Sequence, residues 1–359
     1  MRSNCASASP DPHLLMIASH PKITGWQQIV GHEWAVEILS AAIYHERIGH
    51  AYLITGPAQI GKTTLARLFA QALNCTHEEV AQRPCGQCRS CTLIARDHHP
   101  DVRVVLGEVS GRGRMTLKID QIRELQQALS LTATEAHYKI AILKRFDSAT
   151  IGAANAFLKT LEEPPSNVIL ILTAADSDTL LPTIRSRCRT IPLRPLPFAL
   201  VQDALQTRWA IPSERAEHLA HLADGRLGWA VNAAANTAPL EERESHIVAL
   251  HTALQGNRAQ RFQQADKLAN DAEALPDLLR TWLSWWRDLV LLSWGNNKTA
   301  RLTNIDEQTT LMRLLDKWSP PQILACLQRT NDALWQLERN ANTRLVVENL
   351  LLTYPLMRP

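Results

Sequence analysis

Long apolar runs are missing from this sequence, and none approaches the roughly 18 residues that a membrane-spanning helix needs. The best candidate near the start of the chain, residues 14–18, is too short even for the apolar core of a signal peptide. An excess of one charge is also missing, because 38 lysines and arginines face 35 aspartates and glutamates and leave a net charge of +3. Because the charges of the chain are balanced, its net charge does not indicate a binding partner. We therefore expect a soluble, cytoplasmic protein without a membrane contact.

Cysteine is sparse, with seven residues among 359, which excludes a secreted disulfide scaffold. The seven are unevenly placed, since four of them fall within 17 residues. In a reducing compartment such a cluster indicates a metal site rather than disulfides. The hydrophobic fraction of 45% is ample for packed cores, and the length predicts two or three domains.

Short apolar runs alternate with helical patterns from about Trp26 to Pro197. The apolar runs predict strands at residues 51–55, 102–106, 139–143 and 168–173. The helical patterns between them predict helices at residues 63–73, 119–131 and 153–162. Strands that alternate with helices favour a parallel sheet covered by helices on both faces.

The proline-rich stretch 192–197 interrupts this alternation and is the best candidate for a linker. Before it, we expect a disordered lead-in over residues 1–20 and an α/β domain over residues 21–195. After it, only helical patterns follow, which predicts a small helical domain over residues 196–238 and a larger all-helical domain over residues 239–359. One helical segment of the larger domain is apolar around most of its circumference, and its tryptophans are Trp282, Trp285, Trp286 and Trp294. We expect such a helix to be buried, either in its own domain or between subunits.

Residues 56–63 read Gly-Pro-Ala-Gln-Ile-Gly-Lys-Thr and match the phosphate-binding loop G-x-x-x-x-G-K-[ST]. Its glycines let backbone N–H groups wrap phosphates, and the N-terminus of the helix that follows attracts anions. Lys62 would reach the β- and γ-phosphates, and the Thr63 hydroxyl would bind Mg²⁺. The pattern thus predicts a site for ATP or ADP with Mg²⁺, formed by Gly56, Pro57, Gly61, Lys62, Thr63 and Thr64.

Hydrolysis needs more than this loop, because an acidic residue at the tip of a neighbouring strand must hold Mg²⁺ and a second carboxylate usually activates water. The strand expected at residues 139–143 is followed instead by Lys144 and Arg145. The nearest acid, Asp147, lies three residues beyond Lys144, up to about 10 Å of extended chain. We therefore expect a bound nucleotide that is not turned over, and the alternative is Asp147 as a displaced metal ligand.

The four clustered cysteines offer the number of thiolates that a closed tetrahedral Zn²⁺ site takes. Their order is C-x9-C-x2-C-x2-C, and the two tandem C-x2-C steps are tight enough to share one ion. No vacant coordination position is suggested, so the ion would be structural rather than catalytic. We predict a Zn²⁺ module over residues 75–91, with the ligands Cys75, Cys85, Cys88 and Cys91.

Four further sequence motifs, called boxes below, occur along the chain in addition to the phosphate loop and the cysteine cluster. They read IVGHE at 29–33, GHAYLITGP at 49–57, AANAFLKTLEEPP at 153–165 and LPTIRSRC at 181–188. Together with a zinc knuckle directly after a phosphate-loop helix, they closely resemble the bacterial sliding-clamp-loader subunits of DNA polymerase III, an AAA+ family. The resemblance covers about residues 26–235. It implies an AAA+ P-loop domain with a zinc-knuckle insertion, followed by a helical lid and an all-helical collar that closes a ring of subunits.

Within that family, a motor subunit of the gamma/tau type would carry Asp-Glu in place of Lys144 and Arg145, so the resemblance is to the delta prime type. It implies a stator in an ATP-driven pentameric ring with gamma/tau motor subunits and delta, which loads the sliding clamp on primer-template DNA. It also implies that Arg187, in the Ser-Arg-Cys box, is an arginine finger for the ATP site of a neighbouring subunit. Gly228 stands where the family's second sensor arginine is expected, with Arg226 two residues away.

Two other functions stay open. A motor-type clamp-loader ATPase would hydrolyse ATP with Lys62, Thr63 and Asp147. A zinc-containing phosphate-loop protein could instead bind DNA outside any clamp loader. The stretch 83–145, with eleven lysines and arginines against six acids, fits a DNA contact or a solvated loop.

Overall fold

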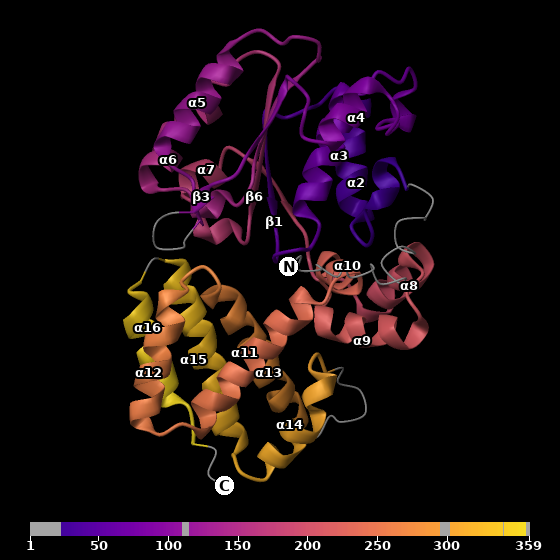
Figure 1. The fold of residues 1–359 in the computed structure, drawn as a ribbon. Helices are drawn as coiled ribbons and strands as arrows, with labels where there is room; N and C mark the ends of the chain where they lie inside the picture. The colour runs from indigo at the N-terminus through magenta and orange to yellow at the C-terminus, as the bar shows by residue number, and fades with distance from the viewer. Residues whose placement is uncertain (1–22, 110–114, 295–301, 340, 357–359) are drawn as a thin grey trace, which may run out of the picture.

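The computed structural model describes residues 23–109, 115–294, 302–339 and 341–356. The lead-in predicted over residues 1–20 lies outside this part of the chain. Figure 1 shows three bodies in chain order: an α/β body in indigo and magenta, a small helical body in red, and a larger helical body in orange and yellow. Within the described ranges, none of the helices combines the length and the hydropathy that a bilayer-spanning segment needs.

The first body is built on a five-stranded parallel sheet with the strand order β2-β5-β6-β1-β7. In that order the strands are β2 (Val102–Val105), β5 (Lys139–Leu143), β6 (Val168–Ala174), β1 (Ala51–Thr55) and β7 (Arg189–Pro192). Every residue of β1 and β6 is buried, as expected for central parallel strands that are covered on both faces. The four predicted strands and the predicted parallel sheet are therefore confirmed, with strand ends correct to within one residue.

The fifth strand, β7, was not predicted. It lies at the edge of the sheet beside β1, and only Ile191 of its four residues is buried. An edge strand with one buried residue lacks the apolar run that identifies a central strand. A small antiparallel pair, β3 (Glu108–Val109) with β4 (Met115–Thr116), follows β2 in the chain.

Helices cover both faces of the sheet, as predicted (Figure 1). One face carries α2 (Glu33–Tyr44), α3 (Lys62–Asn74) and α4 (Arg89–Ala95), which share a core with Tyr52 and Ile54 of β1. The other face carries α5 (Ile119–Ser130), α6 (Ile151–Glu162) and α7 (Pro182–Arg185), which share a core with Leu53. This division follows from the alternation of side chains along a strand. The short 3-10 helices of the chain are η1 (Gly25–Gln28), η2 (Val80–Gln82), η3 (Phe146–Ser148), η4 (Ser177–Thr179) and η5 (Ile305–Glu307).

The small helical body follows the proline-rich stretch and has a core of its own. Its helices are α8 (Phe198–Trp209), α9 (Ser213–Ala223) and α10 (Leu227–Ala235). Gly225 joins the last two with φ +77°, and a Cβ there would lie 2.6 Å from the backbone nitrogen of Leu196. Only glycine therefore allows this body to close against the end of the proline-rich stretch.

The larger helical body buries the tryptophan-rich segment. Its helices are α11 (Ala238–Gln255), α12 (Arg258–Asn270), α13 (Leu275–Ser293), α14 (Gln308–Leu315), α15 (Pro320–Glu338) and α16 (Thr343–Thr353). Trp282, Trp285 and Trp286 of α13 are fully buried in its core, as predicted. Trp294 is not buried in this body, since it lies past the last turn of α13 and is 66% exposed. Burial of Trp294 between subunits stays a prediction.

Candidate functional site

The phosphate loop joins the end of β1 to the start of α3, which is the context that its sequence pattern requires. Gly56 has φ +143°, and a Cβ there would lie 2.5 Å from the carbonyl oxygen of Leu193, so only glycine fits. Gly61 has φ +110° and directly precedes α3. Thr63 and Thr64 lie in the first turn of that helix, whose N–H groups have no intrahelical acceptor. The loop thus has the backbone shape and the helix N-terminus that phosphate binding needs.

Lys62 folds back over this loop. Its Nζ donates hydrogen bonds to the carbonyl oxygens of Gly56, at 2.5 Å, and of Pro57, at 2.6 Å. Burial lowers the pKa of Lys62 to about 8, although the charge of Asp147 acts in the opposite direction. The ammonium is therefore held at the mouth of the loop by oxygen acceptors of the kind that a phosphate would supply.

The sheet edge beside the loop carries a cation where hydrolysis needs an acid. Arg145 follows β5, its backbone N–H donates to the Thr173 hydroxyl at 3.0 Å, and its guanidinium pairs with Oε1 of Glu273 at 2.7 Å. Glu273 also accepts the N–H of Met115 at 2.8 Å, and it lies between α12 and α13 of the larger helical body. Because Mg²⁺ takes oxygen ligands, neither Lys144 nor Arg145 can hold the ion, and Arg145 links the sheet to the larger helical body instead.

The start of α10 approaches the phosphate loop closely at Gly228. A Cβ on Gly228 would lie 2.5 Å from the carbonyl oxygen of Gln59, so a side chain has no room there. The side chain of Arg226 contacts other residues of its own helical body. Its Nε donates to the carbonyl of Ala223 at 2.9 Å, and its guanidinium lies 5.6 Å from the centre of the Trp229 ring. Without a displacement of the loop, no arginine at position 228 could reach a phosphate.

Gly228→Ala is expected to destabilise the protein by about 1–3 kcal/mol, because the new methyl group overpacks the contact with Gln59. Gly152 is the matched control, since it is also the second residue of a helix and its added Cβ would meet only Ile119, at 3.9 Å. Gly152→Ala should stabilise by about 0.5–1 kcal/mol, the ordinary effect of alanine in a helix. Urea unfolding of both variants measures the two signs, and stabilisation by both would refute the close contact.

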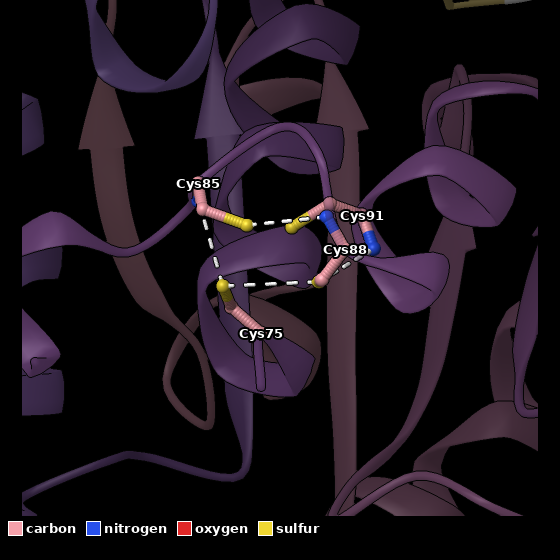
Figure 2. Close-up of side chains that lie close together, drawn as sticks. All are labelled: Cys75, Cys85, Cys88 and Cys91. Atoms are coloured by element: carbon pink, nitrogen blue, oxygen red, sulfur yellow. Dashed lines mark hydrogen bonds between the residues drawn. The ribbon is translucent and has the colours of Figure 1, made fainter. Parts of the chain in front are cut away.

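The four predicted metal ligands come together between α3 and α4. Their sulfur atoms all lie within 4.8 Å of one another, and Figure 2 shows Cys75, Cys85, Cys88 and Cys91 gathered around one point. A tetrahedral ion with sulfur at about 2.3 Å needs sulfur atoms roughly 3.8 Å apart, and the Sγ atoms of Cys75 and Cys88 are 4.0 Å apart. The donor set and its spacing therefore fit a metal ion held by four cysteines.

Backbone N–H groups donate hydrogen bonds to these sulfurs, and at Cys88 they favour the thiolate. The N–H of Cys85 lies 3.4 Å from Sγ of Cys75, and the N–H of Cys88 lies 3.3 Å from Sγ of Cys85. Burial would raise the pKa of Cys88, but hydrogen bonds from Cys91 and Thr76 outweigh it and lower the pKa to about 6. These donors favour the charged form of Cys88, which is the form that binds metal, whereas burial raises the pKa of Cys75 and Cys91.

Arg187 follows a helix on the face of the sheet opposite to α3, the helix that begins at the phosphate loop. It follows α7, whose Ile184 belongs to the core shared with α5 and α6, whereas α3 packs on the opposite face of the sheet. Its guanidinium pairs with Oε1 of Glu162 at 2.8 Å and donates to the carbonyl of Thr183 at 2.9 Å. The fold thus separates Arg187 from the phosphate loop of its own chain.

Three features of the site gave no signal in the sequence. A cavity of about 1180 Å³ is lined by the loop residues 56–59 and by residues of both helical bodies, among them Arg226 and Arg280. The other two features are the partners of the arginines, Glu273 for Arg145 and Glu162 for Arg187. Sequence reasoning missed them because each joins segments that only the tertiary fold brings together.

The sequence is similar to subunits of bacterial DNA polymerase III. The family profile described as "DNA polymerase III, delta subunit" matches residues 31–197. The delta prime subunit of Pseudomonas aeruginosa is 32% identical over 323 residues, 85% of this chain and 91% of that protein. The delta prime subunit of Bacillus subtilis is 35% identical over 187 residues, 52% of this chain and 53% of that protein.

The gamma/tau subunit of Mycobacterium tuberculosis is 36% identical over 170 residues, which cover 47% of this chain. The chain spans only 28% of that relative's length. The α/β body, with its parallel sheet, its helices on both faces and its cysteine insertion, has the architecture that the AAA+ resemblance implied. With 32% identity along 91% of a delta prime subunit, the chain belongs to the family of bacterial DNA polymerase III delta prime subunits.

Proposed function

We propose that the chain is the stator of a DNA polymerase III clamp loader. It sits in a cytoplasmic, pentameric ring with gamma/tau motor subunits and a delta subunit, and the ring loads a sliding clamp on primer-template DNA. The observation that carries this proposal is the end of β5, where Lys144 and Arg145 stand in place of the two acids that hydrolysis needs and where Arg145 pairs with Glu273. The position that contributes to ATP cleavage in a motor subunit therefore forms an ion pair between the α/β body and the larger helical body in this chain.

The stator contributes Arg187 to the ATP site of a neighbouring subunit. Its place on the face of the sheet opposite α3 supports action in trans, because its own phosphate loop lies on the other side. A guanidinium stabilises the charge that develops on the transferred phosphoryl group.

The helical bodies form the lid, over residues 196–238, and the collar, over residues 239–359. Two contacts between them support a rigid unit. Asp224, after α9, pairs with Arg287 of α13 at 2.9 Å, and a ring nitrogen of His221 lies 2.7 Å from the carbonyl oxygen of Leu302. A stator needs such fixed angles between its parts.

The phosphate loop holds ATP or ADP with Mg²⁺ without turning it over, and Lys62 and Thr63 supply its polar side chains. The four cysteines hold a structural Zn²⁺, which staples α4 to the end of α3. The fit of the four sulfurs to a tetrahedral ion supports this assignment.

The isolated chain is expected to bind ATP or ADP and to hydrolyse neither. Lys62→Ala should remove most of the binding, because it deletes the cation at the mouth of the loop. Titration with a fluorescent nucleotide measures binding, and steady-state phosphate release measures turnover. Lys118→Ala, which deletes a cation paired with Glu108 on the small antiparallel pair, should bind like the wild type.

A motor-type ATPase is the second candidate, because Asp147 lies close enough to Lys62 to influence its pKa. Sustained ATP turnover by the isolated chain, abolished by Asp147→Ala, would establish this function in place of the stator.

A further inference from the structure

Two sequence motifs, at residues 153–165 and 181–188, meet at the proposed arginine finger. The box at residues 153–165 forms most of α6, and Glu162 is the last residue of that helix. Pro164 and Pro165 follow, and proline cannot continue a helix, so the end of α6 is fixed at this point. The carboxylate of Glu162 reaches the guanidinium of Arg187 in the box at residues 181–188.

The guanidinium is held at two points. Its two terminal nitrogens lie 2.8 Å from Oε1 of Glu162 and 2.9 Å from the carbonyl oxygen of Thr183, and a longer contact of 3.5 Å reaches the Ser186 hydroxyl. Arginine has five N–H donors, so these contacts leave donors for a phosphate oxygen. The side chains of Arg187 and Glu162 are 35% and 50% exposed, so an incoming phosphate can reach the pair.

Glu162 and Arg187 both lie close to residues that are buried in the core. Leu161, next to Glu162, and Ile184, three residues before Arg187, are almost completely buried in the same core. Pro182 begins α7, where its fixed φ preorganises the first turn. The backbone that carries the carboxylate and the backbone that carries the guanidinium therefore cannot drift apart.

The neighbouring arginine is treated differently. Arg185, the last residue of α7, pairs with Asp178 of η4 and not with a residue of α6. The two arginines thus pair with separate acids, and of the two only Arg187 is attached to α6.

We propose that Glu162 is the positioning residue of the arginine finger. It holds the Arg187 guanidinium in the orientation in which its remaining donors face the phosphate of the neighbouring subunit. An unheld arginine samples many rotamers, and a catalytic cation that is fixed in advance avoids this loss of entropy during the reaction. The inference rests on the proposed function, since it assumes that Arg187 acts on a neighbour's ATP.

The test uses the clamp loader reconstituted from this chain, gamma/tau and delta, with ATP turnover as the readout. Glu162→Gln keeps the shape of the side chain but removes its charge, and it should lower kcat by about 10- to 100-fold, the cost of a misplaced catalytic group. KM for ATP should stay unchanged, because the finger acts in the transition state. Glu163→Gln, at the exposed neighbouring residue, is the matched control and should leave kcat unchanged. Glu162→Asp should recover part of the loss.

A second comparison separates positioning from a merely structural role. In a ring that already carries Arg187→Ala, Glu162→Gln should cost nothing further, because the group that it positions is gone. An equal loss in both backgrounds would overturn the proposal, as would a wild-type or faster rate with Glu162→Gln alone. If Arg187→Ala itself leaves turnover unchanged, the proposed function fails, whatever Glu162→Gln does.

Discussion

Replacing Arg187 by alanine is expected to lower the ATPase rate of the reconstituted clamp loader by about 10³–10⁵-fold, the range of arginine fingers in phosphoryl transfer. The reason is that a fixed guanidinium stabilises charge that develops only in the transition state. Turnover of ATP by the assembled ring, with primed DNA and clamp present, measures the effect.

Two controls make this result specific to Arg187. Arg185→Ala removes the cation at the end of α7 that pairs with Asp178, two residues before Arg187, and it should leave the rate near that of the wild type. Size-exclusion chromatography should show that the Arg187→Ala chain still assembles with its partners, because the exposed finger belongs to none of the buried cores. Wild-type turnover in an intact Arg187→Ala ring would remove the finger assignment.

Loss of the metal is expected to have the second large effect. Structural zinc sites contribute on the order of 10 kcal/mol to the folded state, more than a small module can lose and stay folded. Cys88→Ser should therefore reduce the zinc content from one ion per chain to none and unfold the segment between α3 and α4. Elemental analysis measures the metal, and hydrogen exchange measures the local unfolding.

Cys326→Ser is the matched control for this prediction. Cys326 is a buried cysteine of α15, in the larger helical body and away from the cluster. Its replacement removes one thiol but should leave one zinc ion bound and the exchange of the 75–91 segment unchanged. Zinc retained by Cys88→Ser, or lost from Cys326→Ser, would contradict a single four-cysteine site.

The elements that the sequence predicted are those whose signal is local. The strands β1 and β5 are continuous apolar runs, and the phosphate loop has a motif of fixed spacing between a strand and a helix. β7 was missed because an edge strand with one buried residue has no such run. The apolar pattern continues through Trp294, but α13 ends one residue before it, so the pattern did not reveal that Trp294 is exposed in this chain.

The contacts that define the role of the chain have no local signal. Arg145 and Glu273 are 128 residues apart, so only the packing of the sheet edge on the larger helical body reveals that a catalytic position has become a structural tie. Gly228 could be identified as a missing arginine, but not as the point where α10 touches Gln59. Such pairs depend on tertiary geometry, which residue spacing does not encode.

The ATPase rate of one reconstituted ring, measured with Lys62→Ala and with Arg187→Ala in this chain, tests the stator proposal most directly. Lys62→Ala disables the chain's own phosphate loop, and the ring should still turn over ATP at close to the wild-type rate. Arg187→Ala disables the contribution to the neighbour, and the rate should fall by about 10³–10⁵-fold. A ring that loses its activity with Lys62→Ala and keeps it with Arg187→Ala would show a motor subunit and contradict the proposal.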